Sequence, residues 1–315
     1  MTTLPQHPPE GTGPLRPSAA VARAARRLDA AGVGPARAEA ELLAAYVLGV
    51  PRGRLVLADD LTGDEVARLD ELVRRRVARE PLQHLTGRAG FRHLDLAVGP
   101  GVFVPRPETE LLAGWGVEQG RGRPEPVVVD LCSGSGAIAL AVAQELPGAR
   151  VVAVERSPAA LGWLRRNAAE RAAAGDRPIE VVEADVTAPD LLAELVGGVD
   201  VLLCNPPYVP VDVAVPPEVA GYDPAEAVFG GADGLAVIRP LVTRAAALLR
   251  PGGVFGVEHD DTHGAAVPGL LAADGRFTAV TAHPDLTGRP RYATASRRAD
   301  GQHASAAAAW QTDSS

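Results

Sequence analysis

The sequence contains no lysine, only two cysteines and few aromatic residues, which make up 4% of its 315 positions. A core must therefore be built mainly from alanine, valine and leucine, which fits a hydrophobic content of 46%. Cys132 and Cys204 cannot form a disulfide framework, and this favours a reducing compartment. Long apolar runs are also missing, since no stretch approaches the roughly 18 residues of a membrane-spanning helix. The sequence therefore predicts a soluble, cytoplasmic protein.

Positive charge is also scarce, because 39 acidic residues outnumber 31 basic ones and the formal net charge is -8. A protein that binds duplex nucleic acid usually carries a basic face or stripe, and no such run is present, so no direct nucleic-acid partner is expected. The seven histidines lack metal-ligand spacing, and the N-terminus lacks the apolar core of a signal peptide. We expect a monomer with no metal and no membrane partner.

Two tails flank the predicted folded part. Residues 1–17 are rich in proline and glycine and residues 297–315 are polar, so both are predicted to be disordered. Residues 18–80 carry apolar residues at helical spacing in three segments, which predicts a small helical domain. Its eleven arginines nearly balance its ten acidic residues. This balance favours a docking or packing role over a clamp on DNA.

The ends of these helices carry local signals. Ser18 is predicted to cap the first helix, and Gly49 is predicted to end the second. Thr62 and Glu65 have the spacing of a capping box, so the third helix is predicted to begin there.

The rest of the chain predicts an α/β fold. Residues 81–104 alternate in polarity and contain glycines, which predicts a linker of short strands or a hairpin. Residues 105–296 form the predicted main domain, in which strand and helix patterns alternate. We expect apolar strands at 126–131, 149–155, 179–185, 199–205 and 253–259, and helices at 136–146, 158–174, 191–196 and 235–249. Such strands indicate a Rossmann-like, mostly parallel sheet covered on both faces, and residues 276–296 predict two strands at an antiparallel edge.

Three strand ends carry residues that suit an adenosine-type ligand. "VVVDLCSGSGAIAL" places a glycine-rich turn between a strand and a helix, where the backbone can approach a ligand closely. No Gly-Lys-Ser/Thr follows, so this turn is not a P-loop. Glu155 ends the next strand about 20 residues later, where a carboxylate accepts hydrogen bonds from ribose hydroxyls. Asp185 ends the third strand and is positioned in sequence to accept from an adenine amine.

The fourth strand ends in Asn205-Pro206-Pro207-Tyr208, a rigid corner, because prolines cannot extend a central strand. The Asn205 side chain offers an acceptor, the Pro206 carbonyl offers another, and the Tyr208 ring can stack on a flat group. Two adjacent acceptors suit a planar –NH2 group held for methylation. Because an amide nitrogen is a poor nucleophile, orientation and charge placement must supply much of the catalysis.

At this point the chain resembles a known family. The corner and the glycine turn resemble class I S-adenosylmethionine-dependent methyltransferases that modify planar nitrogens. "GVFVPRPETELL" at 101–112, "NPPYVP" and "DPAEAVFGGADGL" at 223–235 resemble, more narrowly, the release-factor glutamine N5-methyltransferases, or HemK-like family. "AGVGPARAEAELLAAYVLG" and "PLQHLTGRAGFRHLDLAV" resemble that family's helical domain and connecting segment. The resemblance covers roughly residues 20–296.

The resemblance implies methyl transfer from S-adenosylmethionine to the glutamine side-chain amide in the Gly-Gly-Gln motif of bacterial peptide chain release factors, with S-adenosylhomocysteine as the product. The helical domain would dock the release factor. It also implies the following site residues: Cys132, Ser133, Gly134, Ser135 and Gly136 beside the methionine and ribose, Glu155 on the ribose, Asp185 and Val186 beside the adenine, Asn205, Pro206, Pro207 and Tyr208 on the substrate amide, and Phe103, Arg106 and Thr109 closing the site.

Two positions depart from the family pattern. Cys132 stands where the first glycine of the turn is usual, which reduces backbone freedom. Val186 stands where an aromatic-like residue is usual, so stacking on the adenine is lost. Three alternatives stay open: a glutamine methyltransferase acting on a ribosomal protein, a nucleic-acid adenine N6-methyltransferase, and a cofactor-binding protein without catalysis. The net charge opposes the second alternative and the intact Asn205 corner opposes the third.

Overall fold

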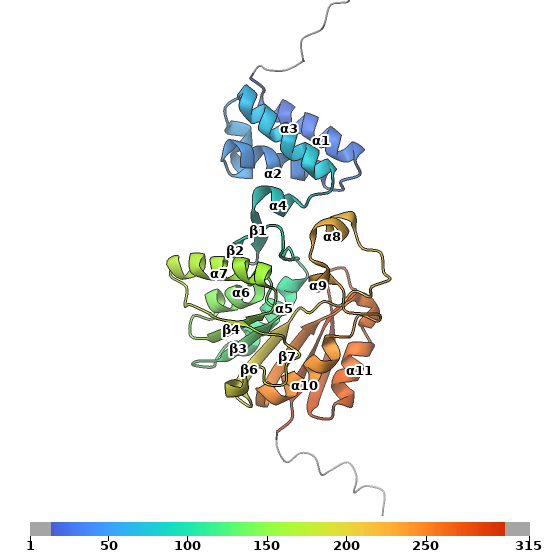
Figure 1. The fold of residues 1–315 in the computed structure, drawn as a ribbon. Coiled ribbons are helices and arrows are strands. Elements are labelled where there is room, and N and C mark those ends of the chain that lie inside the picture. The colour runs from blue at the N-terminus through green and yellow to red at the C-terminus, as the bar shows by residue number, and fades with distance from the viewer. Residues whose placement is uncertain (1–13, 300–315) are drawn as a thin grey trace, which may run out of the picture. The chain divides into compact units, whose positions relative to one another are not determined.

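The structure is a computed structural model that describes residues 14–299, and these divide into two compact units (Figure 1). The helical unit comprises the described residues up to Gly87 together with Pro216–Tyr222. The sheet unit comprises Arg88–Val215 and the described residues from Asp223 onward. The chain therefore leaves the sheet unit for one short segment and then returns to it. No local sequence pattern predicts this excursion.

The helical unit contains five α-helices and one 3-10 helix among the described residues. They are α1 (Pro17–Ala30), α2 (Ala36–Leu48), η1 (Arg52–Leu57), α3 (Gly63–Val77), α4 (Leu82–Thr86) and α8 (Pro217–Tyr222). One apolar core joins α1, α2, η1, α3 and α4, with Leu28, Leu43 and Leu69 almost fully buried, whereas α8 contributes no residue to it. These side chains recur at helical spacing, so packing of amphipathic faces stabilises the unit.

Two of the three predicted helix boundaries are confirmed. Gly49 ends α2 in the left-handed conformation, and Thr62 and Glu65 form the complete capping box of α3. The prediction that Ser18 caps the first helix is wrong. Arg16 precedes α1, and Pro17 occupies its first turn, where its missing N–H costs no hydrogen bond.

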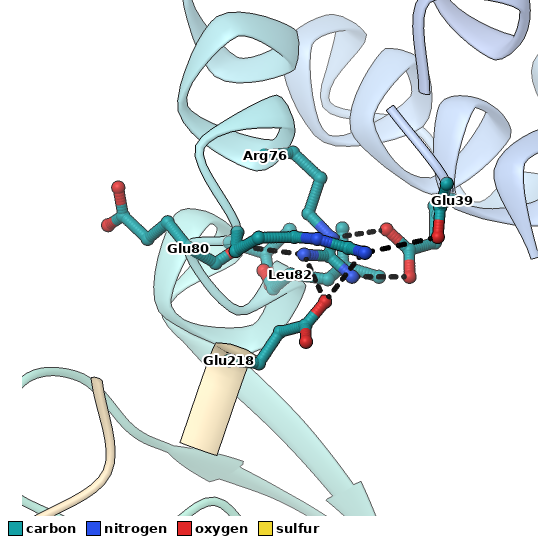
Figure 2. A network of polar contacts seen from close by, with 8 residues as sticks. Glu39, Arg76, Glu80, Leu82 and Glu218 are labelled. Carbon is teal, nitrogen blue, oxygen red and sulfur yellow. Dashed lines mark hydrogen bonds and ion pairs between the residues drawn. The ribbon is translucent and has the colours of Figure 1, made fainter. Parts of the chain in front are cut away.

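A network of charged side chains crosses the helical unit (Figure 2). Arg76 on α3 is 6% exposed and donates to Glu39 on α2, with 2.6 Å between Nε and Oε2. The same guanidinium donates to Glu218 on α8, with 3.0 Å between Nη1 and Oε1, and Arg79 reaches this carboxylate at 3.1 Å. Segments 142 residues apart in sequence therefore share one buried cation.

The sheet unit is built on seven strands in the order β5-β4-β3-β6-β7-β9-β8 (Figure 1). The strands are β3 (Val127–Leu131), β4 (Arg150–Glu155), β5 (Glu180–Glu183), β6 (Val199–Cys204), β7 (Leu249–Glu258), β8 (Phe277–Pro284) and β9 (Pro290–Arg297). The first five pair in parallel, whereas β9 pairs antiparallel with β7 and β8. The predicted Rossmann-like sheet with an antiparallel edge is confirmed.

Helices cover this sheet and enclose two apolar cores. They are α5 (Thr109–Gly120), α6 (Ala137–Glu145), α7 (Pro158–Ala173), η2 (Ala193–Leu195), α9 (Ala225–Val228), α10 (Ile238–Leu248), η3 (Asp261–His263) and α11 (Ala266–Ala273). Residues of α5, α6 and α7 belong to one core, and residues of α10 and α11 belong to the other. Strand residues alternate between the two cores: Val128 belongs to the first and Val129 to the second.

Several sequence predictions need correction. The segment 81–104 does contain a hairpin, β1 (Arg88–Phe91) and β2 (Leu94–Ala97), but it begins with helix α4. Helices α5, α8, α9 and α11 were not predicted. Residues 1–13 and 300–315 of the two predicted tails lie outside the described residues. Leu15 pairs with Leu61, and Arg297 ends β9, so the folded units extend beyond the predicted limits.

Two structural features are absent from residues 14–299. This part of the chain has no helix that is long and apolar enough to cross a membrane. The same residues contain no group of three or more histidine, cysteine, aspartate or glutamate side chains that could hold a metal ion.

Candidate active site

The carboxyl ends of three neighbouring strands meet at one edge of the sheet. β3 lies between β4 and β6, with Leu131 paired to Val154 on one side and to Cys204 on the other. The glycine-rich turn, Glu155 and Asn205 each follow directly from one of these strand ends. The topology therefore brings the predicted cofactor turn and the predicted substrate corner to the same edge.

The turn after β3 uses left-handed backbone at alternate positions. The φ angles are +60° at Cys132, +56° at Gly134 and +87° at Gly136. A Cβ atom at Gly136 would lie 2.6 Å from Cδ1 of Leu164, so this position requires glycine. A Cβ atom at Gly134 would meet nothing within 4 Å, so the backbone there is open to close approach by a ligand. Cys132 adopts the same conformation despite its side chain, at a cost in strain.

Glu155 is tied to that turn. Its Oε2 atom accepts a hydrogen bond from the Gly134 N–H at 2.9 Å. Its Oε1 atom accepts from the N–H groups of Arg156 and Ser157, both at 2.8 Å. A carboxylate oxygen can accept two hydrogen bonds, so Oε2 retains a lone pair for a further donor. Glu155 is thus held in a fixed orientation beside the glycine turn.

Asp185 and Val186 follow β5 and have different environments. The Asp185 Oδ1 atom accepts from the N–H and hydroxyl of Thr187, at 2.8 and 2.7 Å, and Oδ2 contacts Arg156 at 3.2 Å. The Thr187 hydrogen bonds, aided by Arg156, lower the pKa of Asp185, so it is a carboxylate at neutral pH. Val186 is buried and packs within the core, so it offers an apolar surface rather than a polar contact.

Asp130 is a buried carboxyl group at the end of β3 that the sequence analysis missed. It is 1% exposed, and its Oδ2 atom accepts from the Ala139 N–H, in the first turn of α6, at 3.1 Å. Burial raises its pKa to about 7, although Ser133 and Ala139 oppose that shift. The residue therefore joins the strand to the helix that follows the turn, and it favours the helix N-terminus electrostatically when ionised.

Two hydrogen bonds to buried residues hold the Asn205 corner in place. The Asn205 Nδ2 atom donates to the Thr109 hydroxyl at 3.1 Å, and the Tyr208 hydroxyl donates to Glu258 at 3.0 Å. Thr109 and Glu258 are buried, and so are the two prolines of the corner. The structure thus brings Thr109 to the corner, as the "VPRPETE" resemblance implied, and adds Glu258, which the sequence analysis missed.

Phe103 and Arg106, the other predicted site residues of the "VFVPRPETE" segment, contact each other. The Arg106 guanidinium lies over the Phe103 ring at 4.7 Å from its centroid. Arg106 Nη2 also contacts the buried Asp223 Oδ2 at 2.6 Å. Burial raises the pKa of Asp223, and Arg106 opposes that shift. Phe103 and Arg106 are therefore held against the start of the "DPAEAVFGGADGL" segment rather than against Asn205.

The two cysteines lie close together and are free. Cys204 is fully buried at the end of β6. It is paired with Leu131 of β3, and Cys132 follows Leu131 directly in the chain. Burial raises the pKa of the Cys204 thiol, and the nearby Cys132 thiol raises it further. A thiol with a raised pKa is a weak nucleophile at neutral pH, so Cys204 fits a packing role.

Matches to protein families agree with this geometry. Residues 117–216 match the methyltransferase small domain, and residues 19–87 match the PrmC N-terminal domain. The Rossmann-like sheet, the glycine turn after β3 and the Asn205 corner after β6 together define a class I methyltransferase.

Curated relatives narrow this class. A release factor glutamine methyltransferase of Mycolicibacterium smegmatis is 55% identical over 88% of this chain and 96% of the relative. One of Streptomyces coelicolor is 50% identical over 88% of this chain and 96% of the relative. The chain therefore belongs to the release factor glutamine methyltransferase family. A more distant relative, 39% identical over 84% of this chain and 90% of its own length, is a 4-amino-L-phenylalanine/4-methylamino-L-phenylalanine methyltransferase of Streptomyces pristinaespiralis.

Proposed function

We propose that this protein transfers a methyl group from S-adenosylmethionine to the side-chain amide nitrogen, N5, of the glutamine in the Gly-Gly-Gln motif of peptide chain release factors. Membership of the family supports this substrate, because relatives 55% and 50% identical to this chain are release factor glutamine methyltransferases. S-adenosylhomocysteine and the proton that the methylated nitrogen releases to water are the other products. The helical unit docks the release factor, and the reaction takes place in the cytoplasm.

The single observation that carries the proposal is the Asn205 contact with Thr109. Because Nδ2 donates inward at 3.1 Å, the Oδ1 atom of the same amide points away from Thr109. Oδ1 accepts no hydrogen bond from any residue in 14–299, and the Pro206 carbonyl follows it directly in the chain. Two neutral acceptors side by side match the two N–H groups of a primary amide.

The turn and the strand-end carboxylates fit S-adenosylmethionine. The open face at Gly134 admits a ligand close to the backbone, and Glu155 is oriented beside it with a free lone pair. In the proposed assignment Cys132, Ser133, Gly134, Ser135 and Gly136 line the methionine and ribose, Glu155 binds the ribose, and Asp185 and Val186 border the adenine. When bound, the cofactor supplies an electrophilic methyl group on a sulfonium.

The chain's own contribution is to orient a poor nucleophile. Asn205 Oδ1 and the Pro206 carbonyl accept from the substrate –NH2 and hold its nitrogen lone pair toward the methyl group. Both acceptors also stabilise the positive charge that grows on the nitrogen during transfer. Asn205 is neutral, so it polarises the amide rather than removing its proton. Tyr208 packs against the substrate amide, and Pro207 keeps the corner rigid.

A methyl-transfer assay tests the proposal. The purified protein is mixed with labelled S-adenosylmethionine and a purified bacterial release factor, and a release factor with Gly-Gly-Ala in place of Gly-Gly-Gln is the control. Peptide mass spectrometry locates the product. One methyl group on the motif glutamine, absent from the control, is the expected result.

A negative result would redirect the search in a defined way. If S-adenosylmethionine binds but the release factor receives no methyl group, the proposed acceptor is wrong and the cofactor assignment stands. Ribosomal proteins with an accessible glutamine would be tested next, followed by nucleic-acid adenine. Aromatic amines would also be tested, because the relative from Streptomyces pristinaespiralis is named for one.

A further inference from the structure

Glu258 is a buried carboxyl group directly behind the substrate corner. It is the last residue of β7 and is 1% exposed. β7 pairs in parallel with β6, and Val257 is opposite Cys204, so Glu258 and Asn205 are the next residues of the two strands. A carboxyl group is placed in such an environment only at considerable cost in desolvation. A role beyond packing would explain why the chain tolerates that cost.

Glu258 contacts one residue of the corner directly and lies near Thr109, which contacts a second. The Tyr208 hydroxyl donates to Oε1 at 3.0 Å. The Thr109 hydroxyl is a close polar neighbour that stabilises the charged form of Glu258. Oε2 is buried and accepts no hydrogen bond among the described residues, so its lone pairs are available to the Thr109 hydroxyl. Thr109 in turn accepts from Asn205 Nδ2 at 3.1 Å.

We infer that Glu258 is a positioning residue that fixes, through Thr109, which end of the Asn205 amide faces the substrate. The inference rests on the proposed function, because it concerns how the corner receives a primary amide. Glu258 acts through its neighbours and not on the reacting nitrogen.

The orientation of the Asn205 amide depends on the direction of each hydrogen bond. A threonine hydroxyl can donate or accept, so Thr109 alone does not distinguish the two ends of an amide. An ionised carboxylate can only accept, so it commits the Thr109 hydrogen to Glu258. The Thr109 oxygen must then accept from Asn205 Nδ2, and Oδ1 is turned outward. The Tyr208 hydroxyl is committed to Glu258 in the same way.

A protonated Glu258 would remove this constraint. Its own O–H could donate to Thr109, whose hydrogen would then be free to bond Asn205 Oδ1. The Asn205 –NH2 would in that case face the –NH2 of the substrate, and two donors repel each other. Substrate orientation therefore requires the ionised form of Glu258.

Glu258 is placed to change its charge close to neutral pH. Burial raises its pKa to about 7, whereas Thr109, Tyr208 and Arg291 lower it and Glu108 raises it. The titratable and charged groups around it are Cys204 and Tyr208 from the β6 side, Glu108 next to α5, and Arg291 and Tyr292 on β9. We therefore expect turnover to rise with pH through this range.

Steady-state methylation of a release factor over a range of pH values tests the inference. Glu258→Gln keeps the size of the side chain but adds a donor and removes the charge. We expect kcat to fall by about ten- to a hundredfold, with the KM for the release factor and the Kd for S-adenosylmethionine within about twofold of wild type. The rise of kcat with pH should disappear in this variant.

Thr109 supplies an independent pair of variants. Thr109→Val removes the hydroxyl and should lower kcat as Glu258→Gln does. Thr109→Ser keeps the hydroxyl, so its kcat should stay close to that of wild type. Glu180→Gln is the matched control. Glu180 is an exposed carboxylate at the start of β5, whereas the candidate site lies at the carboxyl ends of the strands. It should leave kcat and its pH profile unchanged. Thermal unfolding of every variant establishes that each one is folded.

The outcomes separate this inference from the proposed function. An active wild type together with a Glu258→Gln variant of equal kcat and equal pH profile would overturn the positioning role alone. An active wild type whose Thr109→Val variant is also fully active would do the same. A wild type that binds S-adenosylmethionine but methylates no release factor would overturn the proposed function, and the positioning role with it.

Discussion

At the scale of single residues, the corner depends on one amide. Asn205→Ala removes the acceptor that orients the substrate and leaves the glycine turn and Glu155 in place. We expect kcat to fall by at least about a hundredfold while the Kd for S-adenosylmethionine changes by less than about threefold. Calorimetric cofactor binding and a methylation time course measure the two quantities. Asp212→Ala, an exposed change in the segment that follows the corner, is the control. Turnover within a few-fold of wild type would contradict the role given to Asn205.

Cys132 permits a test of backbone strain at the cofactor turn. Its φ of +60° places a Cβ atom in a conformation that favours glycine. Cys132→Gly should therefore raise the free energy of unfolding by up to about 1 kcal/mol, after the greater flexibility of glycine in the unfolded chain is subtracted. Urea denaturation measures the change.

Cys132→Ala is the matched control for this prediction. It removes the sulfur but keeps the Cβ atom, so it should give no gain in stability. If alanine stabilised the protein as much as glycine, the sulfur and not the backbone would be the source of the effect.

Some residues of the site could be predicted from the sequence and others could not. Glycines, prolines and an asparagine at a strand end are local signals, so the turn and the corner could be identified as a ligand site. Asp130 and Glu258 end apolar strands and look like ordinary strand-end carboxylates in the sequence. Their importance comes from burial, which arises when neighbouring strands and helices pack around them.

At the scale of elements, the link from β3 to α6 should make stability depend on pH. The folded protein holds the pKa of Asp130 at about 7, above the value of about 3.9 for aspartate in an unfolded chain. The folded state therefore binds more protons between these values, so stability is greatest at low pH and falls as the pH rises through about 7. Glu258, raised to about 7 as well, adds a loss of the same sign.

Asp130→Asn should remove the Asp130 part of that loss. An asparagine can still accept from the Ala139 N–H, so the connection to α6 is retained. For each pH value, the free energy of unfolding of wild type is subtracted from that of the variant. We expect this difference to be larger at pH 8 than at pH 5, by on the order of a few kcal/mol. Chemical denaturation at both pH values measures this difference. Asp212→Asn, an exposed substitution, should show none. Equal pH dependence in Asp130→Asn and wild type would contradict the prediction.

The elements that could be predicted are those whose own sequence determines them. Apolar strands predicted the parallel sheet, and two alternating segments predicted the edge hairpin of β8 and β9. Helix α5 was not predicted because its sequence contains three glycines, which have low helix propensity. Packing explains why it forms: a Cβ atom at Gly116 would lie 2.5 Å from Leu203 Cδ1, so glycine lets α5 approach β6 closely. Helix α4 has only five residues, too few for a periodic pattern.

At the scale of the whole molecule, the sequence does not indicate which segments fold together. Residues 216–222 stand between two stretches of the sheet unit, yet they belong to the helical unit. Their attachment rests on side chains far away in sequence. Glu218 contacts Arg76 and Arg79, and the Tyr222 hydroxyl donates to the Ala78 carbonyl at 3.1 Å. These pairings join segments that are far apart in sequence, so no local pattern predicts them.

Arg76 should therefore be the most sensitive charged residue of the helical unit. Arg76→Ala leaves Glu39 and Glu218 partly buried without their shared cation (Figure 2). We expect a loss of about 3–5 kcal/mol in the free energy of unfolding, because uncompensated buried charge is strongly unfavourable. Arg74→Ala is the matched control on the same helix, because the Arg74 pair with Glu71 is exposed and should contribute little to stability. Urea unfolding followed by far-ultraviolet circular dichroism measures both.

A neutral version of the network distinguishes charge from packing. Arg76→Met alone keeps much of the side-chain volume but leaves Glu39 without a cation and Glu218 with Arg79 alone, so it should be nearly as unstable as Arg76→Ala. Adding Glu39→Gln and Glu218→Gln removes those charges, and the triple variant should recover most of the lost stability. If Arg76→Met alone were as stable as wild type, volume would matter and charge would not. If Arg76→Ala cost no more than Arg74→Ala, the network would contribute nothing to holding residues 216–222 in the helical unit.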